Sequence, residues 1–277
     1  MHILIATNNT PHGQKALEYG LGLVKQTGAN CTLVHVINRP EERPSGLAVL
    51  QAQVEQAQQL GLKPRAELRL GLPAEQIVHL AYETDIDLIV MGGGTPEKLL
   101  SRLIAPASER VLANAPCPVL MVRGAARPPK RFLVLHSGAE ALRTLPLFLQ
   151  RAGSILLPGS QVVLLHVMSQ IGASHQVSGW ELYADADELI QNKTLEGEWL
   201  EQGLAFFEPY KGVTTTAKVR HGLVVDEILV EVRQGDYDLV VLGSHRGGTW
   251  QDLLIDNVAK QIAGRTQLPI LVVQRQV

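Results

Sequence analysis

Two glycine-rich segments are the places where this sequence could bind an anion. They are Gly92-Gly93-Gly94-Thr95 and Gly243-Ser244-His245-Arg246-Gly247-Gly248. Glycine lets backbone N–H groups approach a phosphate closely, and the start of a following helix adds partial positive charge. The same composition also suits a tight exit from a buried strand, so both interpretations stay open.

The sequence does not match the common nucleotide-binding and catalytic motifs. Neither segment leads into Gly-Lys-Ser/Thr, which excludes a Walker loop, and the apolar runs that open each half lead into NNTPHG and HSGAEA rather than G-x-G-x-x-G. His136 and Ser137, with His245, could supply a base and a nucleophile, but no acid is assignable to orient the base and G-x-S-x-G is absent. We assign no catalytic residue, and a hydrolase remains an alternative function.

A metal site is not predicted either. None of the nine histidines forms a pair such as H-x-x-x-H, and Cys31 and Cys117 lie in apolar segments, which is typical of small buried hydrophobes in a reduced compartment. His35 and His166 recur in LVHVI and LLHVM, where we expect a structural or pocket-wall role.

An internal repeat indicates which elements position these residues. HILI at residue 2 corresponds to RFLV at residue 131, and LVHV at 33 to LLHV at 164, with offsets of 129 and 131. Gly71, Asp87, Gly92 and Pro118 correspond to Gly222, Asp238, Gly243 and Pro269 at an offset of 151, so an insertion of 20 residues lies within about 172–210. The Pro-rich run AARPPKR at 125–131 is the expected linker, which predicts a first domain over 1–126 and a second over 130–277.

Each half alternates apolar strands with helices. Strands are expected in the first half at 2–7, 31–37, 65–70, 87–92 and 118–123, with helices at 13–25, 48–60, 73–84 and 101–113. The second half has expected strands at 132–136, 161–168, 215–222, 238–243 and 269–274, with helices over 180–210, 224–233 and 257–266. This alternation predicts the α/β class, as two tandem Rossmann-like, doubly wound, five-stranded parallel sheets. Ligands of such sheets bind beyond the carboxyl ends of the strands, where the strand order reverses.

Composition narrows the function classes further. The formal net charge is -2 and aromatic residues make up only 4%, which argues against a nucleic-acid partner. No run approaches the ~20 apolar residues of a membrane span and no leader pattern opens the chain. We expect a cytoplasmic protein without a membrane partner.

Both halves resemble universal stress protein domains. The resemblance is carried by LVHVI and LLHVM, by LGLPAEQIVHLAYETDIDLIVMG and HGLVVDEILVEVRQGDYDLVVLGSH, and by the closing CPVLMV and LPILVV. It implies an adenine-nucleotide-binding fold or a non-binding relative of it. Binding members share G-x-x-G-x(9)-G-[S/T/N], with the phosphates between loop and helix, and an Asp after the first strand that contacts the adenosine part.

This chain departs from that pattern in both halves. The second half keeps Gly243 and Asn257 but has Arg246 and Asp256 at the other glycine positions; the first keeps Gly92 but has Thr95 and Ala105-Pro106. The Asp is replaced by Asn8 and Ser137. Pro106 lacks an N–H, and at ~4 Å and a dielectric constant of about 20 the Asp256 carboxylate would repel a phosphate by roughly 4 kcal/mol. Arg246 would act in the opposite sense, as a bidentate phosphate ligand.

The resemblance therefore implies nucleotide-binding candidates of unequal quality. Those of the second, better half are His136, Ser137, Val167, Gly243, Ser244, His245, Arg246, Gly247, Gly248, Asn257 and Val258. Those of the first half are Thr7, Asn8, Val36, Gly92, Gly93, Gly94 and Thr95. ATP or another adenine nucleotide is the expected ligand, with at most slow hydrolysis, and the alternative is a nucleotide-independent stress or scaffold protein.

Partner surfaces are predicted from apolar segments. In the family the closing strands, here 119–122 and 270–273, lie at the sheet edge, so pairing between the halves would cover both edges and make an internal pseudo-dimer. The remaining apolar surface would allow a homodimer. The aromatic-rich insertion at 172–210 fits either a lid packed on the second half or a surface for a protein partner or an apolar ligand.

Overall fold

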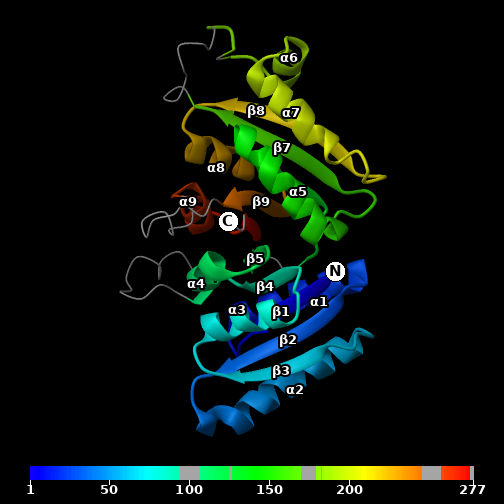
Figure 1. Cartoon of the computed structure of the whole chain (residues 1–277), viewed down its shortest axis with the longest axis vertical. Helices are drawn as coiled ribbons and strands as arrows, with labels where there is room; N and C mark the ends of the chain where they lie inside the picture. Colours follow the sequence, from blue (N-terminus) through cyan, green and yellow to red (C-terminus); the bar gives the residue numbers. More distant parts are fainter. Residues whose placement is uncertain (94–106, 125–126, 170–178, 182, 245–256, 275–277) are drawn as a thin grey trace.

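The structure, a computed structural model, describes residues 1–93, 107–124, 127–169, 179–181, 183–244 and 257–274. Within these residues, ten strands form one sheet in the order β3-β2-β1-β4-β5-β10-β9-β6-β7-β8 (Figure 1). The first repeat contains β1 (His2–Thr7), α1 (Pro11–Thr27), β2 (Asn30–Ile37), α2 (Arg43–Gln59), β3 (Arg65–Leu70), α3 (Pro73–Glu83), β4 (Leu88–Gly92), α4 (Ala107–Asn114) and β5 (Val119–Val122). The second contains β6 (Arg131–His136), α5 (Ala141–Ala152), β7 (Gln161–Met168), α6 (Ala186–Gln191), α7 (Leu195–Ala205), β8 (Thr214–His221), α8 (Val224–Gln234), β9 (Leu239–Ser244), α9 (Asn257–Arg265) and β10 (Ile270–Gln274).

The sheet confirms the predicted α/β class and shows how the two repeats join. Strands within each repeat are parallel, as expected of strand–helix–strand units. The closing strands β5 and β10 pair antiparallel, with Leu120 opposite Leu271. The predicted edge-to-edge pairing is therefore confirmed, and it turns two five-stranded halves into one continuous sheet that spans the long axis of the molecule in Figure 1.

Two apolar cores cover the two faces of this sheet. One packs α1, α2, α5 and α7 against the strands, and the other packs α3, α4, α8 and α9. Each core draws buried residues from both repeats, for example Leu17 and Phe148 in the first and Leu80 and Ile262 in the second. Cys31 and Cys117 are free and buried as predicted, and burial raises the pKa of each thiol to about 12.

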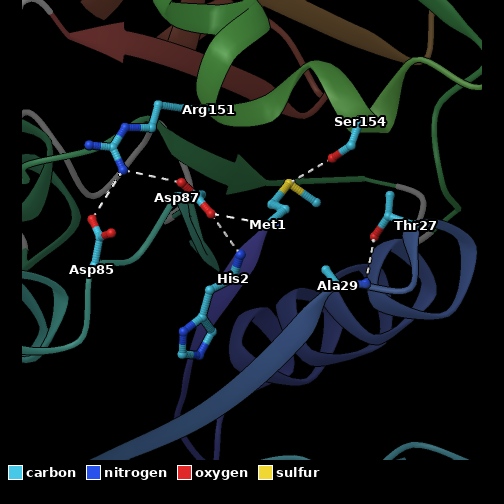
Figure 2. Close-up of polar contacts among 8 residues, drawn as sticks. All are labelled: Met1, His2, Thr27, Ala29, Asp85, Asp87, Arg151 and Ser154. Carbon is cyan, nitrogen blue, oxygen red and sulfur yellow. Dashed lines mark hydrogen bonds and ion pairs between the residues drawn. The ribbon is translucent and has the colours of Figure 1, made fainter.

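Polar contacts add to the seam between the repeats at the amino ends of β1 and β6. Figure 2 shows Arg151 of α5 reaching across to the first repeat, where Nη1 lies 3.2 Å from Asp85 Oδ1 and 3.1 Å from Asp87 Oδ1. Asp87 also accepts a hydrogen bond from the backbone N–H of His2 at 2.8 Å. Its counterpart Asp238 accepts from the backbone N–H groups at 130 and 131. Each repeat thus fixes the start of its first strand with an aspartate at the corresponding position.

The insertion is where the sequence prediction is wrong. The single helical region expected over 180–210 is two short helices, α6 and α7, because the backbone breaks between them at Lys193, which has φ +52. Asp185 and Thr194 each accept a backbone N–H at the start of one of these helices. Helix α7 packs on β7 and β8 as α2 packs on β2 and β3, while Leu189 of α6 packs against Met168 at the end of β7.

The boundaries of two other helices also differ from the prediction. The helix expected at 48–60 begins earlier, at Arg43, because Pro44 fits its first turn. The helix expected over 101–113 is described only as Ala107–Asn114, since 94–106 lie outside the described residues.

Candidate functional site

The strand order reverses at two places, and both lie where the glycine segments begin. Strand β1 lies between β2 and β4, and β6 lies between β7 and β9, so the carboxyl ends of β1 and β4, and of β6 and β9, are neighbours. The register pairs Ala6 with Met91 and Val134 with Val241, so Thr7 and Gly92, and likewise His136 and Gly243, follow at the same edge of the sheet. Gly94, Thr95, His245, Arg246, Gly247 and Gly248 fall outside the described residues, and for Ser244 and Asn257 only the backbone is described.

In the first repeat, the polar groups at this point are already engaged by the fold. The Thr7 hydroxyl lies 2.6 Å from Gln53 Oε1 of α2 and 3.2 Å from the carbonyl of Val34. The Asn8 side-chain oxygen accepts a hydrogen bond from the Thr10 hydroxyl at 2.6 Å, and Thr10 in turn accepts the Gly13 N–H that begins α1. Asn8 is therefore held over the start of α1.

The glycine that ends β4 or β9 has a packing role in each repeat. A Cβ on Gly92 would lie 2.7 Å from the carbonyl oxygen of His12, and a Cβ on Gly243 would lie 2.9 Å from the Thr144 side chain. Both neighbours sit on the first helix of their repeat. These glycines let the strand end approach that helix, which favours the structural interpretation of these two positions.

Replacing Gly243 by alanine is accordingly expected to destabilise the protein by about 1–3 kcal/mol through overpacking against Thr144, whether or not any ligand is present. Gly264 of α9 is the matched control, because nothing lies within 4 Å of its Cβ position. Gly264→Ala is expected to stabilise by roughly 0.5–1 kcal/mol. Urea unfolding of both variants measures the difference, and equal effects would contradict this account.

In the second repeat a pair of histidines occupies the ends of β6 and β7. The Nδ1 of His166 hydrogen-bonds the His136 carbonyl at 2.9 Å, just as Nδ1 of His35 bonds the Thr7 carbonyl at 3.2 Å. Each of these histidines thus ties the first two strands of its repeat together, as the predicted structural role requires. The rings of His136 and His166 meet edge to face, with centroids 5.8 Å apart.

The His136 ring is buried beneath α7. A Cβ on Gly203 of α7 would lie 3.2 Å from its Nε2, and the side chain is only 4% exposed. Neither ring nitrogen makes a hydrogen bond to any residue the structure describes, Ser137 included. Burial, followed by the charge of the neighbouring His166, lowers the pKa of His136 to about 4. The two groups considered as a hydrolytic base and nucleophile are thus not paired.

Ser137, at the corresponding strand end of the second repeat, is exposed, as Asn8 is. Unlike Asn8, it is not engaged by a described neighbour, and its side chain does not cap the short turn that follows. Gly138 next to it has φ +65 and lies under the ring of Trp199, whose Cζ3 would be 3.0 Å from a Cβ there. The second repeat therefore presents a hydroxyl not hydrogen-bonded to the described part of the chain, beside the wall that α7 provides.

The remaining candidates lie deeper. Val36 and Val167, on β2 and β7, are partly buried and pack on the core that α3 and α8 cover, and Val258 packs on the same core from α9. Within the described ranges, no three His, Cys, Asp or Glu residues come together to hold a metal ion, and no helix is long and apolar enough to cross a membrane.

Comparison with known families decides the identity of this architecture. The sequence profile of the universal stress protein family matches residues 1–123 and 146–274, which is one match in each repeat. The chain belongs to the universal stress protein family.

Similar proteins agree with that assignment. A universal stress protein of Methanocaldococcus jannaschii is 28% identical over 137 residues, covering 44% of this chain and 81% of that protein. One of Thermus aquaticus is 30% identical over 133 residues, covering 44% of this chain and 97% of that protein. The crystal structure of a universal stress protein of Archaeoglobus fulgidus has a TM-score of 0.69 at 18% identity, covering 99% of this chain and 96% of that one, a likeness that concerns the fold.

Three residues around the sites of this universal stress protein were not predicted. Gln53 of α2 and Trp199 of α7 lie at the ends of the first strands, and Arg123 follows β5 with a 6% exposed side chain. The Arg123 guanidinium donates to the carbonyl of Ala263 near the end of α9, lies against Gly93, and has its pKa lowered by burial. In sequence, Gln53 and Arg123 were only polar residues in a helical segment and after a strand, and Trp199 was one aromatic of the insertion. None of these signals names the contact that each residue makes.

Proposed function

We propose that this universal stress protein is a regulatory binding module that takes up one adenine nucleotide, in the second repeat. The observation that carries the proposal is the difference between the two strand ends: both side chains are exposed, but Asn8 accepts a hydrogen bond from Thr10, whereas Ser137 is not hydrogen-bonded to the described residues. The loop that follows β9 adds Arg246 and two glycines in sequence. Membership of a family whose fold is suited to adenine nucleotides supports the ligand class.

Arg246 provides the test. Native mass spectrometry and calorimetry with ATP are expected to give one ATP per chain, and Arg246→Gln is expected to weaken the affinity about tenfold or more, because a charge-assisted phosphate contact is lost. Arg233→Gln, at an exposed position on α8, is the matched control and is expected to bind as the parent does. Asn8→Ala tests the first repeat, and it is expected to leave the affinity for ATP unchanged.

Absence of heat and of a mass shift at millimolar ATP would contradict the proposal. It would favour a nucleotide-independent scaffold instead, an alternative supported by the packing roles of Gly92 and Gly243 and by the engagement of Asn8. Chromatography of the nucleotide after prolonged incubation measures hydrolysis, for which we expect at most slow turnover, because His136 and Ser137 are not paired.

A further inference from the structure

A cavity of about 320 Å³ lies in the second repeat. It is lined by α8 and by the strands β6, β7 and β8, and it includes Arg131 at the start of β6, whereas Gly243 lies near the carboxyl end of β9. Its volume is at the lower end of the range for small-molecule sites. The residues that line it are Arg131, Val163, Thr216, Ala217, Lys218, Glu231, Gln234, Gly235 and Tyr237.

The first repeat shows how unusual these residues are. At the offset of 151, Glu231 corresponds to Leu80 and Tyr237 to Ile86, which are 0% and 2% exposed. Glu231 and Tyr237 are also buried, at 2% and 6%. The same place in the same fold is therefore filled by two apolar side chains in one repeat and by a carboxylate and a phenol in the other.

The buried carboxylate is fully engaged by its neighbours. Glu231 lies 2.7 Å from Lys218 Nζ and 3.0 Å from Arg220 Nη1, and it accepts a hydrogen bond of 2.6 Å from the Tyr237 hydroxyl. Burial would raise the pKa of Glu231, but Lys218, Tyr237 and Arg220 lower it overall. Exchanging such a buried ionic group for a well-packed apolar one is often neutral or stabilising, so stability alone does not explain why Glu231 replaces leucine.

The cations at the rim of the cavity are less engaged than the carboxylate. The Arg131 guanidinium lies over the Tyr237 ring, 5.7 Å from its centroid, and its nearest acid in the described chain is Asp236 at 3.7 Å, which is 84% exposed. Lys218 is 46% exposed and keeps two further N–H donors beyond Glu231. Two cations and one carboxylate line the cavity, so its formal charge is positive.

From this cavity we infer a second binding site in the protein, for a small organic anion. Arg131 and Lys218 hold a carboxylate or phosphate group at the rim, and Val163 and Ala217 contact the apolar body of the ligand. Glu231 is a positioning residue, because it orients the Lys218 ammonium group and the Tyr237 hydroxyl. This site is independent of nucleotide binding, because Gly243 and the other nucleotide-binding candidates are not among its described lining residues.

Calorimetry with benzoate and phenyl phosphate as probes, and with neutral benzamide as the uncharged analogue, tests the site. We expect millimolar or tighter binding of at least one anion and none of benzamide. Lys218→Met is expected to weaken binding at least about tenfold. The double variant Glu231→Leu with Tyr237→Ile, which restores the residues of the first repeat, is expected to abolish it. Lys63→Met, an exposed lysine of the first repeat, is the control.

Amide chemical shifts locate the bound probe. Shifts at Ala217, Lys218 and Gly235 support the site, whereas shifts confined to Gly243 and its neighbours would place the anion at the glycine loop and overturn the inference. Absence of binding by both anions, or equal affinity in the parent and Lys218→Met, would also overturn it. Because Lys218→Met alters an exposed side chain, it keeps the test decisive if the double variant fails to fold.

Discussion

Substituting leucine for His136 is expected to make the protein markedly more resistant to acid. In the native state the pKa of His136 is lowered from 6.5 to about 4, so the buried ring stays neutral while the ring in the unfolded chain takes up a proton. The unfolded state then binds more protons than the native state, and stability falls as the pH drops from 6.5 towards 4. The full shift corresponds to roughly 3 kcal/mol, which His136→Leu removes.

The measurement is the free energy of unfolding by urea at a series of pH values between neutrality and pH about 4. The parent curve is expected to fall steeply over this range and the curve of His136→Leu to fall less, with the largest difference at the acid end. His79→Leu, on the exposed surface of α3, controls for the loss of an imidazole. Parallel curves for the parent and His136→Leu would contradict a buried neutral ring beneath α7.

Shortening Leu271 to alanine is expected to destabilise both repeats together. Leu271 lies opposite Leu120 at the centre of the β5–β10 pairing, is fully buried, and belongs to a core that includes residues of both repeats. A cavity at such a site costs about 2–5 kcal/mol. Because the sheet and both cores run across the seam, the parent is expected to unfold in one transition that shifts as a whole in the variant.

Calorimetry, supplemented by urea unfolding followed separately at amides of β2 and β7, distinguishes joint from independent unfolding. Leu223→Ala is the control, because that leucine is 54% exposed and its truncation is expected to change stability by no more than about 0.5 kcal/mol. Two separate transitions, of which only the second repeat's is shifted, would show that the seam does not couple the repeats.

The parts of the fold that could be predicted are those encoded locally or by the repeat. The strand at 65–70 has the bounds expected, because a short run of alternating residues is set off by Pro64 and Gly71. The β5–β10 pairing followed from two apolar closing segments that would otherwise leave edges exposed. The offset of 151 likewise placed Asp87 and Asp238 at equivalent positions.

What could not be predicted depends on pairings between distant residues. Gln53 meets Thr7 across 46 positions, and Arg123 meets Ala263 across 140. The burial of His136 under Gly203 depends on where α7 packs, which the broken insertion conceals in sequence. The glycines at 92 and 243 suggested phosphate binding, yet their packing against the first helices emerges only when strand and helix are placed together.

The two repeats that pair through β5 and β10 belong to one polypeptide, and this removes a constraint that applies to every symmetric assembly. In a homodimer of single units, any substitution appears in both copies at once, so a costly residue must be tolerated twice. Covalent linkage keeps the two units paired at any protein concentration while allowing each to change alone. Glu231, which corresponds to Leu80 of the first repeat, and Ser137, which corresponds to Asn8, are such changes in one repeat only. The tandem arrangement is thus a permanent heterodimer encoded in one polypeptide, in which one half can keep the fold while the other acquires new chemistry.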